Sequence, residues 1–232
     1  MSFIENSYSM IFRKMLWAIN PIKKKIIKTE CEVHKFINNQ SLDILKNDKY
    51  LLAYNFLSSY IEDINKGVVW ADQDFKSSNH FYNPDEEKGL YGCSNAKKEC
   101  INYYTKALSK YNSGDIKKAM FYFGAACHLV QDMTVPQHVN VKLLNHHRKY
   151  ELWVIKAYKH HEAFKVINDG IYLESIPQYI DLNSKKAIEA YGKNAAEKNI
   201  HTRFYNITLA TLSQAQKTTA GMFLKFYKDI KK

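Results

Sequence analysis

The sequence predicts an all-α domain, and three observations carry that prediction. Apolar side chains recur every three or four residues over most of the chain, which is the spacing that gives a helix one buried face. Runs of β-branched residues are few, and no hairpin turn stands between alternating strands. Only 8 Gly and 4 Pro occur among 232 residues, so few positions interrupt a helix. The length fits one domain.

The first predicted helix spans about 41–65 and carries Leu42 and Leu45 on its apolar face. We expect it to end near Gly67. The following stretch, 70–93, is rich in Asp, Asn, Ser and Gly and predicts a long ordered loop, and loops of that length are often functional.

Helical spacing resumes over 96–111 and stops at the Asn-Ser-Gly sequence of 112–114. Asp115 is a predicted N-cap for a helix over 116–133, which Pro136 is expected to close. Three further helices are predicted over 147–167, 183–199 and 204–227.

Composition excludes several classes of protein. With 46% hydrophobic residues the chain has material for a core and is not disordered, and no apolar run reaches the roughly 18 residues of a membrane span. Four cysteines without paired spacing exclude a disulfide scaffold, and Cys127 is expected to be a small core residue. The net charge of +11, with a lysine cluster at 23–28, would attract nucleic acid, anionic membranes or acidic substrates alike.

A span of 24 residues carries the sharpest chemical signal, with His128, Asp132, His138, His147 and Glu151 spaced as H-x3-D-x5-H-x8-H-x3-E. Residues four apart share one face of a helix, so each His/carboxylate pair can offer two donors to one ion. Imidazole and carboxylate donors together suit zinc. Each pair alone is also typical of a capped or salt-bridged surface histidine, but two pairs with a further histidine between them favour a metal site.

The chain resembles the bacterial zinc-dependent phospholipase C family, which includes the catalytic domain of alpha-toxin-type enzymes. The resemblance runs from about 17 to 227 and rests on four stretches: 119–138 (AMFYFGAACHLVQDMTVPQH), 67–72 with 80–85, 147–151, and 215–223. It implies an all-α fold with three zinc ions in a cleft. The chain ends soon after the last of these stretches, so we expect it to lack the lipid-binding β-domain that alpha-toxin-type relatives append.

The resemblance also implies the zinc ligands. Asp72, His80, His128 and Asp132 would hold one zinc, and His138, His147 and Glu151 a second. Trp17, His34 and Asp132 would hold the third, which in the family is bound through the free amine and carbonyl of an N-terminal Trp. Asp72 is the candidate catalytic base, acting on the attacking water.

Some positions depart from the family pattern. Asn20, Gln73 and about Ser77 stand where choline-selective members place an acid and aromatic residues, so a cation–π cage for choline is not expected. Gln131 replaces the glycine usual within H-x3-D, and Val139 replaces the small residue after the second histidine. Both changes lie beside expected ligands.

We expect an N-terminal extension or pro-segment remnant over 1–16, followed by the catalytic domain over 17–232. The extension lacks the basic and apolar regions of a signal peptide. The resemblance implies secretion, and a cytoplasmic enzyme is the alternative.

The expected activity is hydrolysis of the glycerol-side phosphodiester bond of phospholipids, giving diacylglycerol and a phosphorylated headgroup. The expected partner is phospholipid substrate at a membrane surface, and no nucleic-acid partner is expected. We expect the protein to be a monomer. One alternative is a three-zinc single-strand nuclease. Nucleases of that class have an H-x3-D motif where this chain has His147 and Glu151, an H-x3-E motif. The other is a non-catalytic, zinc-stabilised membrane-surface protein.

Overall fold

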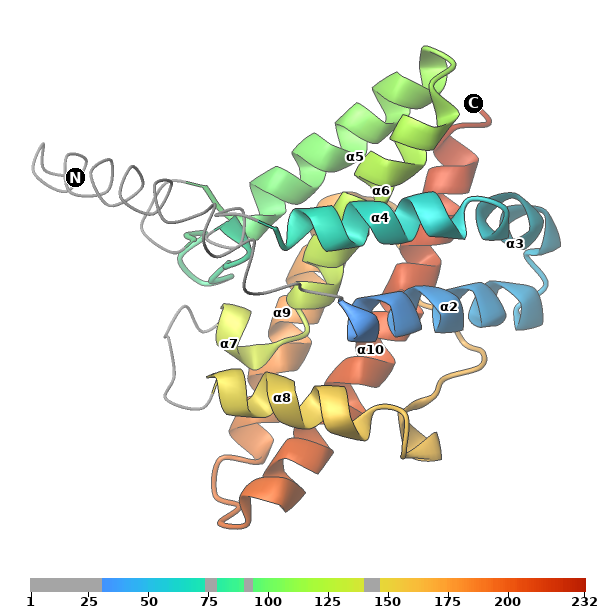
Figure 1. Ribbon diagram of the computed structural model, residues 1–232. Helices are drawn as coiled ribbons and strands as arrows, with labels where there is room; N and C mark the ends of the chain where they lie inside the picture. The colour runs from blue at the N-terminus through green and yellow to red at the C-terminus, as the bar shows by residue number, and fades with distance from the viewer. Residues whose placement is uncertain (1–30, 74–78, 90–93, 140–146) are drawn as a thin grey trace, which may run out of the picture.

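The part of the chain that the structure describes, residues 31–73, 79–89, 94–139 and 147–232 of a computed structural model, is built of helices (Figure 1). Within these residues no strand forms, and one isolated bridge pairs Asn83 with Lys88. The predicted all-α class is therefore confirmed. The helices are α2 (Glu32–Asn47), α3 (Leu51–Ser58), α4 (Ile61–Ala71), α5 (Ala96–Asn112), α6 (Ile116–Asp132), α7 (Pro136–Val139), α8 (His147–Ala157), the 3₁₀ turn η3 (Glu162–Phe164), α9 (Ile176–Lys193) and α10 (Ile200–Asp229). The expected N-terminal extension lies outside the described residues.

The predicted first helix, 41–65, is wrong, because α2, α3 and α4 share this region. The chain leaves α2 at Asp48, and Lys49 then adopts the left-handed conformation with φ of 70°, which a continuing helix does not allow. A short turn at Ser59 and Tyr60 separates the next two helices. Apolar residues stay at helical spacing across these turns, so periodicity alone gave no sign of them.

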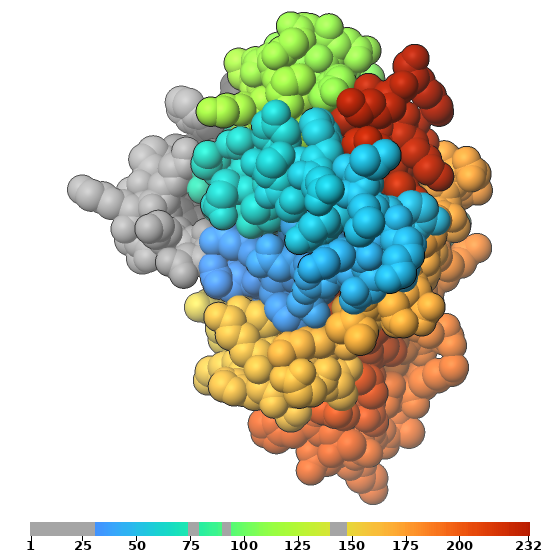
Figure 2. Space-filling model, turned by 90° about the vertical axis from the view of Figure 1, so that its right-hand side faces the viewer, coloured from blue at the N-terminus to red at the C-terminus, as the bar shows by residue number. Residues whose placement is uncertain are grey.

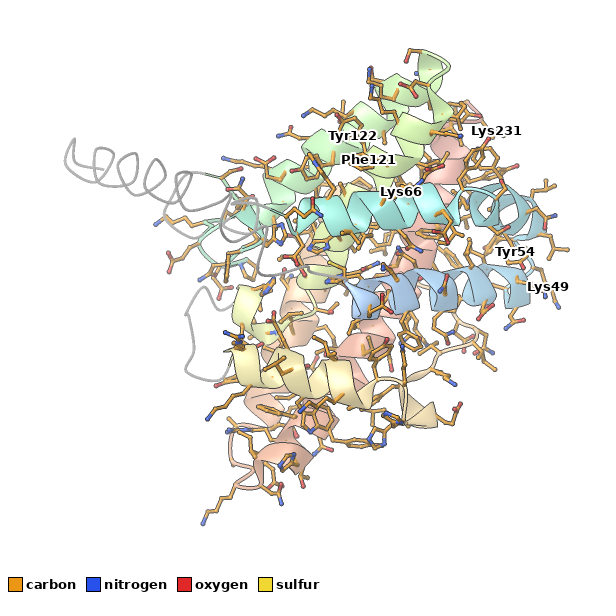
Figure 3. The ribbon with its side chains drawn as sticks, in the orientation of Figure 1. Lys49, Tyr54, Lys66, Phe121, Tyr122 and Lys231 are labelled. Atoms are coloured by element: carbon orange, nitrogen blue, oxygen red, sulfur yellow. The ribbon has the colours of Figure 1, made fainter. Side chains whose placement is uncertain are left out.

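Helix α4 also runs past its predicted end at Gly67, because that glycine serves a helix crossing and not a stop. A Cβ atom at Gly67 would lie 1.8 Å from the carbonyl oxygen of Phe121, and one at Gly124 would lie 2.0 Å from that of Ile64. The backbones of α4 and α6 therefore touch at two glycines. Phe121 and Lys66, labelled in Figure 3, lie on the two helices at this crossing.

The predicted helices 96–111 and 116–133 are confirmed as α5 and α6. The side chain of Asp115 caps α6 by accepting from the backbone N–H of Lys118, as predicted. Pro136 does not close α6 but begins α7, where a proline needs no amide partner. Cys127 is fully buried, as expected.

The last three predicted helices exist with different bounds. Helix α8 is shorter than 147–167 and is followed by η3, whereas α10 extends beyond 204–227 at both ends. Helix α9 begins seven residues before the predicted 183, since Ser175 and Gln178 form a reciprocal capping box at its start.

Two packed groups of helices meet in one core. Helix α6 packs against α4 and α5, whereas α10 packs against α2 and α9. The stacked rings of Phe123 and Phe226, with centroids 4.2 Å apart, join α6 to α10 in the centre. In both Figures 1 and 2, α2 lies between α4 and the segment that carries α8. Among the described helices, none is long and apolar enough to cross a membrane.

Candidate metal centre

The candidate ligands gather at one side of the molecule, where α2 and α8 begin and α4 and α6 end (Figure 1). They come from the first turn of α2 (His34), the residue after α4 (Asp72), a loop (His80), the end of α6 (His128 and Asp132), α7 (His138) and α8 (Glu151). Trp17 lies outside the described residues. His147 is described only as the first residue of α8, so its side chain is not placed.

Asp132 is the centre of the cluster. Its Oδ2 atom lies 2.8 Å from His80 Nδ1, 3.2 Å from His128 Nε2 and 3.4 Å from His138 Nδ1. Its Oδ1 atom lies 3.6 Å from His34 Nε2. One carboxylate is therefore surrounded by four imidazoles drawn from four separate segments of the chain.

Burial makes this arrangement electrostatically demanding. Asp132 is 2% exposed and His128 is 1% exposed. Burial alone would raise the pKa of the Asp132 carboxyl, but His128 and His138 beside it hold that pKa well below its usual range. Burial likewise acts to lower the pKa of His138, which the Asp132 and Glu151 carboxylates raise to about 10. For His34, burial and then His128 lower the pKa to about 4. The site thus combines an ionised carboxylate with one imidazole whose pKa is raised, His138, and one whose pKa is lowered, His34.

His80 shows that the cluster fits a cation. A backbone carbonyl oxygen can only accept, so the Nε2 atom of His80 donates to the Ala71 oxygen 3.1 Å away. A neutral ring then has its lone pair at Nδ1, the atom that lies 2.8 Å from Asp132 Oδ2. A lone pair and a carboxylate at that distance repel unless the ring gains a second proton or a metal ion lies between them.

The donor spacing is close to that around a bound zinc ion. His80 Nδ1, His128 Nε2 and Asp132 Oδ2 lie 2.8 to 3.3 Å from one another. Bonds of about 2.0–2.1 Å to a tetrahedral zinc place its donors about 3.3 Å apart. The other ring nitrogen of His128, Nδ1, is buried and has no hydrogen-bond partner among the described residues.

Two further groupings flank this one. The Nε2 atom of His138 lies 3.6 Å from Glu151 Oε1, which brings together two of the three residues expected for a second zinc. On the other flank, His34, His128 and Asp132 each offer a donor within 4.8 Å of the others. Asp72, His80 and His128 meet the same criterion.

Asp72 is half-buried, with a raised pKa. Burial is the main cause of the shift and the charge of Asp132 adds to it. The thiol of Cys31 contacts it, with Sγ 3.7 Å from Asp72 Oδ2. Cys31 is a site residue that sequence reasoning missed, and its only signal was its position three residues before His34.

Gln131 also belongs to the site, since its Oε1 atom lies 2.8 Å from His34 Nδ1. The sequence marked it as a departure from the family glycine, beside the expected ligand Asp132. The pattern did not indicate which ligand it would contact.

A cavity of about 600 Å³ opens from the cluster between α2, α8 and α10. One part of its wall is formed by His34, Asp72, His128, Asp132, His138 and Glu151. Much of the remaining wall is apolar and is contributed by Val33, Ile37, Leu152, Val154, Ile155 and Leu212. The cavity thus joins a polar, cation-attracting end to a hydrophobic surface.

Comparison with known proteins gives a consistent family. Residues 33–221 match the family described as zinc dependent phospholipase C. A phospholipase C of Clostridium novyi is 23% identical over 235 residues, covering 86% of this chain and 59% of that protein. A phospholipase C of Bacillus cereus is 29% identical over 136 residues, covering 52% of this chain and 48% of that protein.

Solved structures show the same fold. An alpha toxin from Clostridium absonum matches with a TM-score of 0.76 at 20% identity, covering 86% of this chain and 65% of that one. The chain spans less than two thirds of the length of each of these relatives.

Proposed function

Because the chain belongs to the zinc-dependent phospholipase C family, as its motifs predict, we propose that it hydrolyses the glycerol-side phosphodiester bond of phospholipids. The products are diacylglycerol and a phosphorylated headgroup. The observation that carries the proposal is the convergence of His80 and His128 on Asp132 at the polar end of a cavity with apolar walls.

The proposed ligands divide among three zinc ions. Asp72, His80, His128 and Asp132 hold the first, His138, His147 and Glu151 the second, and Trp17, His34 and Asp132 the third. Bound zinc supplies positive charge that neutralises the phosphodiester and makes water a stronger acid.

Asp72 acts as the general base in this proposal. Its carboxylate receives the proton of the attacking water, the bond between phosphorus and the glycerol oxygen breaks, and that oxygen takes up a proton as diacylglycerol leaves. The apolar wall of the cavity, including Leu152 and Ile155, which are 47% and 51% exposed, offers hydrophobic surface to the acyl part of the substrate. A phosphate next to hydrocarbon is the chemistry of a phospholipid.

The test is release of phosphorylated headgroup from mixed phospholipid vesicles by the purified protein, after chelation, and after zinc is returned. Activity that chelation removes and zinc restores supports the proposal. A protein that binds zinc but cleaves only single-stranded nucleic acid, or cleaves nothing, refutes it.

Asp72→Asn tests the base. We expect this variant to fold and keep most of its zinc but to lose hydrolysis. Asp63→Asn is the matched control, because Asp63 lies in the first turn of α4, the helix that Asp72 follows, and pairs with the exposed Lys66 at 2.9 Å, away from the cluster. Undiminished turnover in Asp72→Asn removes this residue from the mechanism.

A further inference from the structure

We propose that Gln131 is a positioning residue for His34, holding the hydrogen on Nδ1 of this imidazole and directing Nε2 toward Asp132. The inference rests on the proposed function, since it takes His34 to be a zinc ligand. It names a residue of this chain that acts through a ligand without binding the metal itself.

The two ring nitrogens of His34 have different neighbours. Nδ1 lies 2.8 Å from Oε1 of Gln131, whereas Nε2 lies 3.6 Å from Oδ1 of Asp132. Gln131 and Asp132 are consecutive on α6, so one short stretch of helix contacts both sides of the ring. A ligand that binds zinc through Nε2 must carry its hydrogen on Nδ1, where an acceptor oxygen is present.

A chain of side-chain amides fixes the direction of Gln131. Its Nε2 atom donates to Asn38 Oδ1 at 2.9 Å and to Thr219 Oγ1 at 3.3 Å, which occupies both of its hydrogens. Asn38 in turn donates through Nδ2 to Asn65 Oδ1 at 2.9 Å. The oxygen of Gln131 is therefore left for His34, and the amides together with the Thr219 hydroxyl link α2, α4, α6 and α10.

Burial makes these hydrogen bonds hard to replace. Gln131 is 1% exposed, and Asn38 and Thr219 are 0% exposed. Water has little access to the network, so rotating the amide would leave buried polar atoms without partners at a cost of about 1–3 kcal/mol each. The amide therefore offers His34 a fixed acceptor.

Ring stacking alone would not fix the ring. The rings of His34 and His128 stack with centroids 4.2 Å apart and planes at 20°. Stacking holds the plane of the imidazole, but a half-turn of the ring about its Cβ–Cγ bond keeps that plane and exchanges nitrogen and carbon positions. The hydrogen bond from Nδ1 to Gln131 selects one of the two orientations, as outer hydrogen-bond partners do for metal-bound histidines.

The experiment compares three variants of the full chain. Gln131→Met has a similar volume but offers Nδ1 only a weakly accepting thioether, and Gln131→Glu keeps an acceptor oxygen. Gln216→Met is the matched control, because Gln216 is equally buried but, among the described residues, its side chain bonds to backbone atoms of Phe164, Val166 and Leu212 and to no expected ligand. Zinc affinity is measured by chelator competition, and stability by denaturation with zinc removed.

A spectroscopic measurement reports on the tautomer. Long-range ¹H–¹⁵N NMR distinguishes a ring protonated at Nδ1 from one protonated at Nε2, and the signals of His34 are assigned by their loss in His34→Ala. We expect Gln131→Met to weaken the His34-dependent zinc by about 10–100-fold and to lose the fixed Nδ1–H signal. Gln131→Glu keeps the acceptor but loses the two N–H donors to Asn38 and Thr219, so it is expected to retain the Nδ1–H signal and bind zinc more tightly than Gln131→Met, at lower stability. Gln216→Met is expected to lower stability while leaving the zinc affinity and the signal unchanged.

The outcomes separate this inference from the proposed function. If the unmodified protein binds no zinc, the proposed function fails. If it binds zinc but His34→Ala or Gln131→Met binds zinc as tightly, the positioning role is overturned. Equal losses of zinc in Gln131→Met and Gln216→Met would also overturn it, since general instability would then explain the effect.

Discussion

The crossing of α4 and α6 predicts that Gly124→Ala destabilises the protein, although alanine is the better helix former. Gly124 lies inside α6, where replacement of glycine by alanine ordinarily stabilises by about 0.5–1 kcal/mol. In this structure the added Cβ atom would lie 2.0 Å from the carbonyl oxygen of Ile64. That oxygen belongs to the backbone of α4 and cannot rotate away as a flexible side chain would.

The size of the effect follows from the overlap. Ordinary van der Waals contact begins at 3.4 Å, so the two helices must separate by about 1.4 Å at this point. Overpacking of this kind costs about 1–3 kcal/mol. For a domain of this length each kcal/mol lowers the melting temperature by roughly 2–4 °C. The separation also moves Asp72, at the end of α4, away from His128, one turn beyond the glycine, so zinc affinity should fall as well.

The assay is thermal and chemical unfolding followed by circular dichroism at 222 nm, with zinc and with chelator. Gly192→Ala is the matched control, because Gly192 is also helical but a Cβ atom there meets nothing within 4 Å. We expect the control to gain about 0.4–1 kcal/mol. If Gly124→Ala is as stable as the unmodified protein, the backbone contact between α4 and α6 is not as close as described.

Three further predictions concern the metal and the response to pH. Chelation should lower the melting temperature and zinc should restore it, because a ligand at 100 times its Kd stabilises the folded state by about 2.7 kcal/mol. A melting temperature that neither chelator nor zinc changes would contradict this prediction. Asp132→Asn should fold yet retain far less zinc by elemental analysis, since it removes the carboxylate that four histidines approach; full zinc content in the variant would count against the centre described above. Burial acts to raise the pKa of Asp48, but hydrogen bonds from Tyr172 and from the backbone N–H groups of Gly170 and Asp169 lower it overall. The stabilisation by ionised Asp48 is therefore present above its unfolded pKa of 3.8 and is lost as the pH falls through the lower folded value. Asp48→Asn should therefore make the free energy of unfolding fall less steeply with decreasing pH on the acid side. An unchanged dependence on pH in this variant would refute the assignment.

Local sequence predicted the features that local geometry controls. The helices α5 and α6, with Asp115 as a cap, follow from spacing and capping chemistry within a few residues. The turn at Lys49 and the continuation of α4 through Gly67 did not follow. Both features depend on what the segment packs against. A glycine can end a helix in one protein and permit a close helix crossing in another, and its local sequence does not distinguish the two.

The candidate site divides in the same way. The spacing of His128 with Asp132 is a property of one helix, and the sequence by itself predicted that pair and the zinc chemistry it suits. The approach of His34 to Gln131, 97 residues away, was decided only by tertiary packing. The sequence determined the donor types because chemistry resides in side chains. The tertiary structure decided which donors share an ion, because helices that cross at glycines and pack around one core bring distant residues within 3 to 4 Å.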